Sequence, residues 1–363
     1  MKSKIISFVL LMYCTLSGAQ QHRWERISPV RGLWDKGDTV SVMIIGDVMM
    51  HARQLQYDCG PFLQGIKDRL ETASLAVANM EFTLGGEPYS GYPSFSAPDS
   101  YAAYVKDCGI DVFLMANNHI MDKGTRGLER TLEVYRNMEG IRFTGAAADS
   151  AERARNHPLI VAVEGIRIAF VNCTYGVNGG YVPQWPCVNL QDTDDLSEAI
   201  ASARRSKADF VVALPHWGEE YVLRHGASQQ RLAQRLAEEG VDAVVGAHPH
   251  VVQDSCILSG PMGKKVPVFY SIGNAVSNMS APNTRLELAV TLRFVKRPWA
   301  DPEMLPPSVE FLWCTLPGKL IANYAVVPVR EWMGRREQWM QSSDYDNMVS
   351  TYERVKSITG IQD

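Results

Sequence analysis

The sequence predicts an α/β fold for residues 38–295. Short apolar runs rich in β-branched residues alternate there with segments of helical periodicity, which is the pattern of a sheet covered by helices. The apolar runs are typical of strands that are buried on both faces. No repeat, low-complexity tract or linker rich in proline and serine divides this stretch. We therefore expect one large domain with a smaller appended segment.

The N-terminal residues 1–19 are expected to be a signal peptide. Two lysines precede a short apolar run, and the small residues at 17–19 suit a cleavage site. The run is shorter than the ~20 residues that span a bilayer. Cys14 is not expected to carry a lipid anchor, because Met12 and Tyr13 stand where small residues would be needed. The protein is therefore expected to be exported to the periplasm, the extracellular space or the cell envelope.

Seven strands are predicted after the signal peptide. They cover residues 39–47, 75–81, 111–119, 166–174, 209–219, 242–250 and 266–274. Between them, Leu128, Leu132 and Tyr135 recur at i, i+4 and i+7 of a predicted helix. A second helix is predicted within 227–240 and is closed by Gly240.

Residues 296–363 are predicted to be a C-terminal extension, because the regular pattern loosens there. A proline-containing loop is expected at 297–308, followed by strands at 309–316 and 324–329. A terminal helix is expected at 344–358.

Charge and cysteine content narrow the function classes. Without the two lysines of the signal peptide, the chain carries 34 basic and 40 acidic residues, a net charge of −6. This balance argues against a nucleic-acid partner, which would require clustered Lys and Arg. Six of the seven cysteines lie beyond the signal peptide and none forms a CxxC motif. They are candidates for disulfides or core positions rather than for metal ligands.

Six of the seven predicted strands end in polar residues of metal-binding or catalytic type. In order, these ends carry Asp47; Asn79 and Glu81; Asn117, Asn118, His119 and Asp122; His216 and Glu219; His248 and His250; and Asn274. The carboxyl ends of strands line the ligand crevice of open α/β sheets, so these segments are expected to meet at one site.

The residue types favour a divalent metal centre. Carboxylate, amide oxygen and neutral imidazole together suit Mn, Fe or Zn, and the absence of Cys argues against a closed structural zinc site. Glu81 is the candidate for a carboxylate that bridges two ions. In the segment HPH, an extended backbone would aim His248 and His250 to the same side. Each imidazole would then serve one ion of a pair.

Each motif taken alone has a simpler interpretation. Asp47 after Gly46 fits a turn or a helix N-cap, and NNH fits a capped turn. HWGEE fits a packed histidine, and HPH fits a surface pair. Their shared position at strand ends is what favours a common site.

The motifs together resemble a known family. IIGDVMMH, NMEFTL, FSAP, FLMANNHIMDKG, HWGEEY, GAHPHVVQ and YSIGNA occur in this order between about residues 40 and 276. They resemble the CapA/PgsA family of bacterial capsule and poly-γ-glutamate synthesis proteins, which is similar to the calcineurin-like metallophosphoesterases. The resemblance implies a four-layer α/β/β/α sandwich with one or two metal ions at the strand ends.

The resemblance also implies roles for individual residues. His119 would be the general acid, and Asp122 would hold its tautomer. Metal ligands are assigned to Asp47, Glu81, Asn118, His216, His248 and His250. Substrate contacts or support of the ligands are assigned to Asn79, Glu219, Gln253 and Asn274.

The sequence departs from the phosphoesterase pattern at two positions. Met49 stands where the Asp-x-His opening has its histidine, so the first metal position is expected to be weak or vacant unless His51 replaces it. Ala275 stands in SIGNA where the family usually has Phe.

Two functions remain open. The first is an exported hydrolase that cleaves a phosphoester or a γ-glutamyl amide during capsule or poly-γ-glutamate synthesis or export. The second is a non-catalytic accessory subunit that binds the polymer. The implied partners are an anionic envelope polymer or its precursor and membrane-bound capsule synthase subunits.

Overall fold

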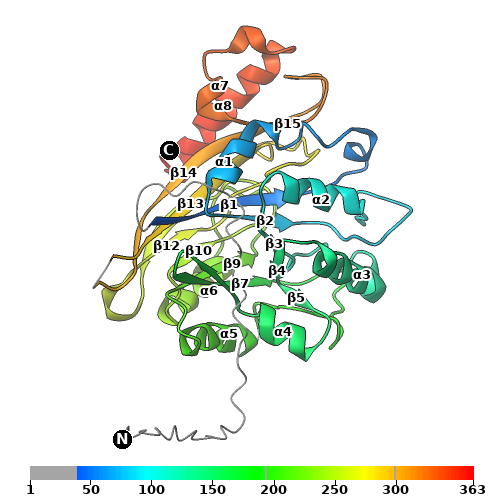
Figure 1. Ribbon diagram of the computed structural model, residues 1–363. Helices are drawn as coiled ribbons and strands as arrows, with labels where there is room; N and C mark the ends of the chain where they lie inside the picture. The colour runs from blue at the N-terminus through cyan, green and yellow to red at the C-terminus, as the bar shows by residue number, and fades with distance from the viewer. Residues whose placement is uncertain (1–38, 193, 298–299) are drawn as a thin grey trace, which may run out of the picture.

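The computed structural model describes residues 39–192, 194–297 and 300–363. Two large sheets face each other, with helices on their outer faces (Figure 1). The predicted signal peptide and Cys14 lie outside the described residues. Within them, no helix is both long and apolar enough to cross a membrane.

The first sheet has seven strands. In spatial order they are β15 (Ala325–Pro328), β14 (Glu303–Thr315), β13 (Leu286–Val295), β1 (Thr39–Val48), β2 (Leu75–Met80), β3 (Val112–Leu114) and β4 (Arg142–Thr144). The strands β1 to β4 are parallel to one another, whereas β13, β14 and β15 add antiparallel neighbours on the other side of β1. The parallel half brings the carboxyl ends of β1, β2 and β3 to one edge.

The second sheet has six strands. In spatial order they are β11 (Ser255–Ser259), β12 (Lys265–Phe269), β10 (Ala243–Val245), β9 (Phe210–His216), β7 (Ile166–Thr174) and β6 (Leu159–Val163). The four central strands are parallel, and β6 and β11 are antiparallel edge strands. A separate small sheet pairs β5 (Ala146–Ala147) with β8 (Cys187–Val188).

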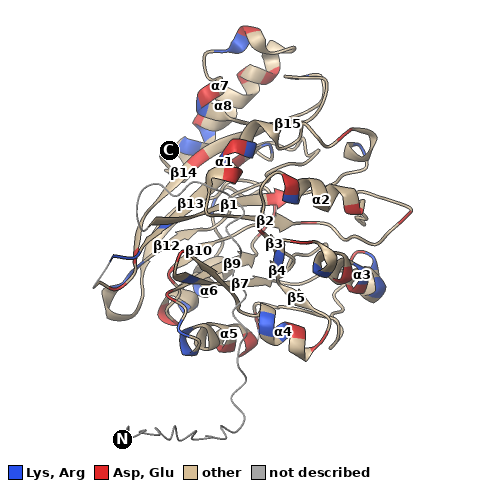
Figure 2. Cartoon of the chain, in the orientation of Figure 1, with Lys and Arg blue, Asp and Glu red and all other residues tan. Residues whose placement is uncertain are grey.

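The helices cover the sheets from outside. The α-helices are α1 (Lys67–Thr72), α2 (Asp99–Asp107), α3 (Gly124–Asn137), α4 (Ser150–Asn156), α5 (Asp194–Arg205), α6 (Ala227–Glu238), α7 (Val329–Trp332) and α8 (Ser342–Thr359). The short 3-10 helices are η1 (Gln54–Gln56), η2 (Gln64–Ile66), η3 (Pro261–Gly263) and η4 (Arg336–Gln338). Charged side chains lie mainly on the helices and outer loops, as Figure 2 shows.

Three hydrophobic clusters define four layers. Alternate residues of β1 face opposite sides, so that Val42 and Ile44 pack between the sheets while Met43 and Ile45 pack under α1, α2 and α3. In the second sheet, the outward-facing residues of β7 and β9 pack under α5 and α6. The predicted α/β/β/α sandwich is confirmed.

Most predicted elements are found, and the differences lie at their ends. The strand predicted at 166–174 is β7, and the two predicted helices are α3 and α6. Gly240 follows α6 with a left-handed backbone (φ 93°). In contrast, β3 ends at Leu114, because Asn117 turns the chain by accepting a hydrogen bond from the His119 N–H at 3.1 Å.

The loop predicted at 297–308 is partly strand. β14 begins at Glu303 and pairs with β13. The register shifts between Thr291 and Arg293, so a bulge accommodates the two prolines at 306–307 within the ladder. The extension thus continues the first sheet, and α8 covers the space between the sheets.

The described cysteines are unpaired. Cys108, Cys173 and Cys314 are buried, which matches the core alternative rather than the disulfide alternative.

Candidate metal centre

The polar residues at the strand ends meet between the two sheets. Asp47 ends β1, Glu81 follows β2, and His216 ends β9, while the other members lie in the turns after β3 and β10. None of the predicted ligands is more than 3% exposed. The candidate ligand atoms form three groups, and the atoms within each group lie within 4.8 Å of one another. The groups are Glu81, His216 and His248; Asp47, Glu81 and His250; and Glu220, His248 and His250.

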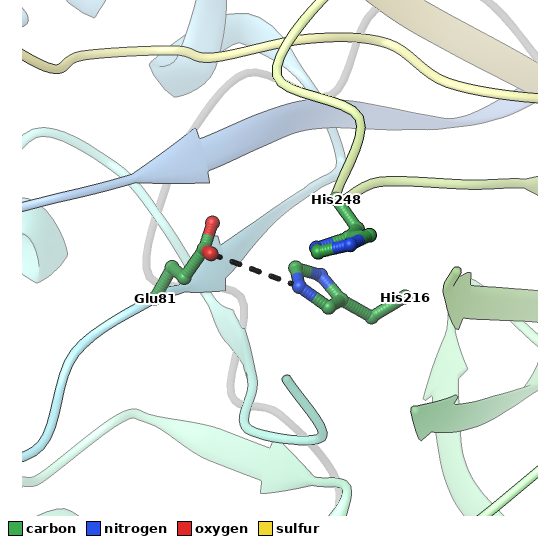
Figure 3. Close-up of side chains that lie close together, drawn as sticks. All are labelled: Glu81, His216 and His248. Atoms are coloured by element: carbon green, nitrogen blue, oxygen red, sulfur yellow. Dashed lines mark ion pairs between the residues drawn. The ribbon is translucent and has the colours of Figure 1, made fainter. Parts of the chain in front are cut away.

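Glu81 lies at the centre of the cluster. Its Oε1 is 3.7 Å from Nε2 of His216 and 3.9 Å from Nε2 of His250. Figure 3 shows its carboxylate directed at the His216 ring, with the His248 ring beside it. Both Glu81 oxygens are buried without a hydrogen-bond partner. Burial, followed by the charge of Asp47, holds the pKa of Glu81 well above its usual range.

Asp47 is fixed by hydrogen bonds from both sheets. Asn79 donates to its Oδ1 at 2.7 Å, and Nδ1 of His250 lies 3.3 Å from its Oδ2. Burial would raise the pKa of Asp47, but the hydrogen bond with His250 and the charges of His216 and His250 lower it to about 2. Asn274 Oδ1 accepts from the same His250 nitrogen at 2.8 Å, which directs Nε2 of that ring toward Glu81.

His216 is oriented by two asparagines. Its Nδ1 lies 3.3 Å from Nδ2 of Asn79, and its Nε2 lies 2.9 Å from Oδ1 of Asn118. Burial and then the charge of His248 hold the pKa of His216 well below its usual range. A neutral imidazole with one free nitrogen is the form that binds metal.

The HPH segment differs from the extended backbone that the sequence predicted. β10 ends at Val245, and both His248 (φ 98°) and His250 (φ 58°) have left-handed backbones. The two rings are 5.9 Å apart, and His248 packs 4.8 Å from the ring of His216. Local strain of this kind persists only where tertiary contacts hold it. Here it places His248 with Glu81 and His216, and His250 with Glu81 and Asp47, while both rings also lie near Glu220.

His119 lies beside the cluster and is held by Asp122. Its Nδ1 is 2.7 Å from Oδ2 of Asp122, which also accepts the Phe95 N–H at 2.7 Å. Asn178 lies 3.0 Å from the same ring nitrogen and donates to the other Asp122 oxygen at 3.4 Å. The Phe95 ring packs edge-on against His119 at 4.7 Å. The arrangement fixes the ring and leaves Nε2 available for proton transfer.

Glu219 is not brought into the cluster. It is exposed, whereas the next residue, Glu220, belongs to a group of candidate ligands. Gly218 turns the chain with φ 97°, and the Tyr221 N–H donates to Pro249 O at 2.8 Å. This turn places Glu220, rather than its neighbour, against the HPH segment.

Gln253 supports the site from a distance. Its side chain accepts from Gln229 at 2.8 Å and donates to the backbone of Val222 at 2.8 Å and of Arg224 at 3.2 Å. It therefore ties the loop after β9 to α6 and is in none of the ligand groups.

The histidine missing at Met49 is not replaced by His51. Met49 is buried in the core beneath α2. Nδ1 of His51 lies 3.1 Å from Gln54 Oε1 and 3.2 Å from the Asn278 backbone nitrogen. Burial lowers the pKa of His51 to about 4. Within the described residues, no group of candidate ligands contains it.

Sequence reasoning missed Asn178, Tyr175 and Tyr221, and of the pair Glu219 and Glu220 it favoured Glu219. Tyr175 follows β7, the one predicted strand that ends without a metal-binding residue, and its ring packs 4.7 Å from His248. The position of Tyr175 directly after a strand could have indicated a place at the site. The sequence analysis considered that position only for side chains of metal-binding or catalytic type.

The donor set fits a divalent cation. Metal bonds of about 2.1 Å place neighbouring ligand atoms roughly 3.0–3.4 Å apart. Three pairs of ligand atoms lie at 2.9 Å (Asn118 and His216), 3.7 Å (Glu81 and His216) and 3.9 Å (Glu81 and His250). A cation there would also provide a partner for the two unpaired Glu81 oxygens and for Nδ1 of His248, which is likewise unpaired. Glu81 occurs in two groups, as a bridging carboxylate would.

The chain has a metallophosphoesterase-like fold, a four-layer sandwich with candidate metal ligands at its strand ends. Residues 41–279 match the family described as bacterial capsule synthesis protein PGA_cap, and the chain belongs to that family. The resemblance of its motifs to CapA proteins is therefore confirmed.

Two relatives agree with this family, and a solved structure shares the fold. The chain is 27% identical over 318 residues to the "Capsule biosynthesis protein CapA" of Bacillus anthracis, covering 83% of this chain and 74% of that protein. It is 29% identical over 208 residues to the "PGA biosynthesis protein CapA" of Bacillus subtilis, covering 57% of this chain and about half (53%) of that protein. A putative 5'-nucleotidase from Staphylococcus aureus shares the fold, with a TM-score of 0.51 at 12% identity, over 75% of this chain and 54% of its own.

Proposed function

We propose that this protein is an exported, metal-dependent hydrolase that acts in the synthesis or export of an anionic capsule polymer. One observation carries the proposal. Glu81 is completely buried with both carboxylate oxygens unpaired, and His216, His248 and His250 surround it. An unpaired buried carboxylate is costly, so this arrangement is understandable as a place for a cation.

The residues divide between two metal positions. Asp47, Glu81 and His250 would hold one ion, and Glu81, Asn118, His216 and His248 would hold the other. When bound, one or two ions of Mn, Fe or Zn lower the pKa of water and neutralise the charge of the bond being cleaved. Asn79 and Asn274 keep the ligands oriented through their hydrogen bonds to Asp47 and His250.

His119 supplies the proton for the leaving group. Its Nδ1 is engaged by Asp122, so a proton held at Nε2 is available to the oxygen or nitrogen that departs.

The bond cleaved is a phosphoester or a γ-glutamyl amide. Both require the same water activation and the same proton donor. Family membership supports an anionic envelope polymer or its precursor as substrate and membrane-bound synthase subunits as partners. Export rests on the signal peptide predicted at residues 1–19, which lie outside the described structure.

Metal analysis and a substrate panel test the proposal. The purified protein is expected to contain a divalent metal and to hydrolyse either a phosphoester or a γ-glutamyl peptide. The H216A variant should lose turnover while keeping its circular dichroism spectrum. Full metal content without turnover on any member of the panel would refute the hydrolase and favour the accessory subunit.

A further inference from the structure

Exposed aromatic side chains are concentrated in three segments of the described chain. Large aromatic residues are usually buried, so their exposure in one region indicates a binding surface. The other exposed large hydrophobic residues are aliphatic. The exposed aromatic residues are Tyr89 and Tyr92, Tyr175, Tyr181 and Trp185, and Tyr221.

These segments, here called the rim segments, comprise residues 86–98, 175–186 and 217–226. Each is anchored to the candidate metal centre by a backbone donor. The Phe95 N–H donates to Asp122 at 2.7 Å, the Asn178 N–H to Asn118 O at 2.8 Å, and the Tyr221 N–H to Pro249 O at 2.8 Å. The rim segments therefore border the proposed reaction site.

One tyrosine of each rim segment packs against a different site histidine. Tyr92 lies 6.5 Å from His119, Tyr175 lies 4.7 Å from His248, and Tyr221 lies 6.2 Å from His250, between ring centroids. The three tyrosines are 73%, 44% and 46% exposed. Each thus has one contact with the centre and a large surface open to a ligand.

The rim segments have few positive charges. The segment 175–186 has no charged residue, and the other two contain Glu87, Glu219 and Glu220 against a single arginine, Arg224. That arginine is 66% exposed and lies 4.0 Å from Asp254. A chain of γ-linked glutamates, with one carboxylate per residue, would meet repulsion here.

We propose that Tyr92, Tyr175 and Tyr221 bind the sugar ring of a sugar phosphoester whose phosphate is held at the metal ligands. This inference rests on the proposed function. Of the two bonds named there, a phosphoester and a γ-glutamyl amide, it selects the phosphoester. Aromatic faces pack on the C–H faces of a sugar, and Glu219 and Glu220 can accept hydrogen bonds from its hydroxyls.

The cleavage balances as a hydrolysis. The oxygen of water bonds to phosphorus, the bond from phosphorus to the sugar oxygen breaks, and that oxygen takes the proton from His119. The products are a sugar with a free hydroxyl and a phosphate.

Steady-state kinetics on the manganese-loaded full chain tests the inference. The substrates are glucose 1-phosphate, adenosine 5'-monophosphate, methyl phosphate and a γ-glutamyl tetrapeptide. For glucose 1-phosphate, Y92A and Y221A should raise KM roughly tenfold each, with kcat changed less than threefold, as expected for loss of an aromatic contact. Y92F should retain the wild-type KM. I257A removes a 60% exposed side chain on β11 and should change nothing.

The outcomes separate the two proposals. Equal KM changes for methyl phosphate and glucose 1-phosphate would overturn the sugar site while leaving the hydrolase intact. A lower KM for the tetrapeptide than for glucose 1-phosphate, lost in Y92A, would overturn it in favour of another ligand. A lower KM for adenosine 5'-monophosphate than for glucose 1-phosphate, lost in Y92A, would assign the tyrosines to the base instead of the sugar and would also overturn it. If no substrate is turned over, equilibrium dialysis with glucose 1-phosphate decides: retained binding that Y221A weakens supports the sugar site although the hydrolase fails, and no binding refutes both.

Discussion

Replacing Glu81 with Gln should abolish the stabilisation that a divalent metal gives to this protein. Gln keeps the shape of the side chain but removes the charge that two groups of ligands share. In the metal-free protein, burial already holds the pKa of Glu81 well above its usual range, so ionisation of this group is unfavourable. We therefore expect the metal-free E81Q protein to melt at or above the wild-type temperature.

The size of the effect follows from chain length and metal occupancy. A metal present at one hundred times its Kd stabilises the folded state by about 2.7 kcal/mol. Unfolding entropy of about 2.1 cal/mol/K per residue gives roughly 0.8 kcal/mol/K for 363 residues. The wild-type Tm should thus rise by about 3–4 °C. If E81Q binds the metal a hundredfold more weakly, the metal stabilises the folded state by only about 0.4 kcal/mol, which raises Tm by roughly half a degree.

Differential scanning calorimetry with manganese and with EDTA measures this shift. The matched control is E287Q, because Glu287 is also buried with one oxygen unpaired but is in none of the ligand groups. E287Q should keep the full metal-induced shift. If E81Q keeps it as well, Glu81 is not a ligand and the reasoning from its unpaired oxygens fails.

Three further predictions concern other buried charges. D122N should lower kcat about a hundredfold or more with KM little changed, because the ring of His119 loses the partner that fixes its orientation; an unchanged kcat would contradict the orienting role. Burial raises the pKa of Glu287 to about 8 from 4.5, so the folded state binds the extra proton and stability falls as pH rises from about 4.5 to 8. Urea titrations across that range should show a smaller fall for E287Q than for the wild type. R285A should cost about 3–5 kcal/mol in the same assay, because Asp344 loses its buried partner at 2.6 Å; a loss below 1 kcal/mol would refute this.

The strands and the residues of the cluster could be predicted from sequence because both depend on local pattern. An apolar run followed by Asp, Asn, Glu or His located β1, β2, β3, β9 and β10, although β3 and β10 end five residues before the predicted ends. β13 was missed, although Leu286, Leu288, Val290, Leu292 and Phe294 alternate along it and are all buried between the sheets.

The backbone at the site could not be predicted, because long-range hydrogen bonds set it. Gly246 N–H donates to Phe269 O and Ala247 N–H to Pro215 O, which continues the pairing with both neighbouring strands past Val245. The left-handed backbones of His248 and His250 then turn HPH out of the extended form. A positive φ at Gly218, inside the motif HWGEE, likewise decides that Glu220 rather than Glu219 reaches the histidines.

The candidate centre lies between the two sheets, because Asp47 and Glu81 come from the first sheet and the histidines come from the second. A cation bound by both sets of ligands would join the two halves of the sandwich. The strands that complete the first sheet, β13 to β15, come from the end of the chain, after every ligand has been synthesised. Metal uptake would therefore mark the last stage of folding and would distinguish a finished molecule from one whose sheets have formed but not yet docked.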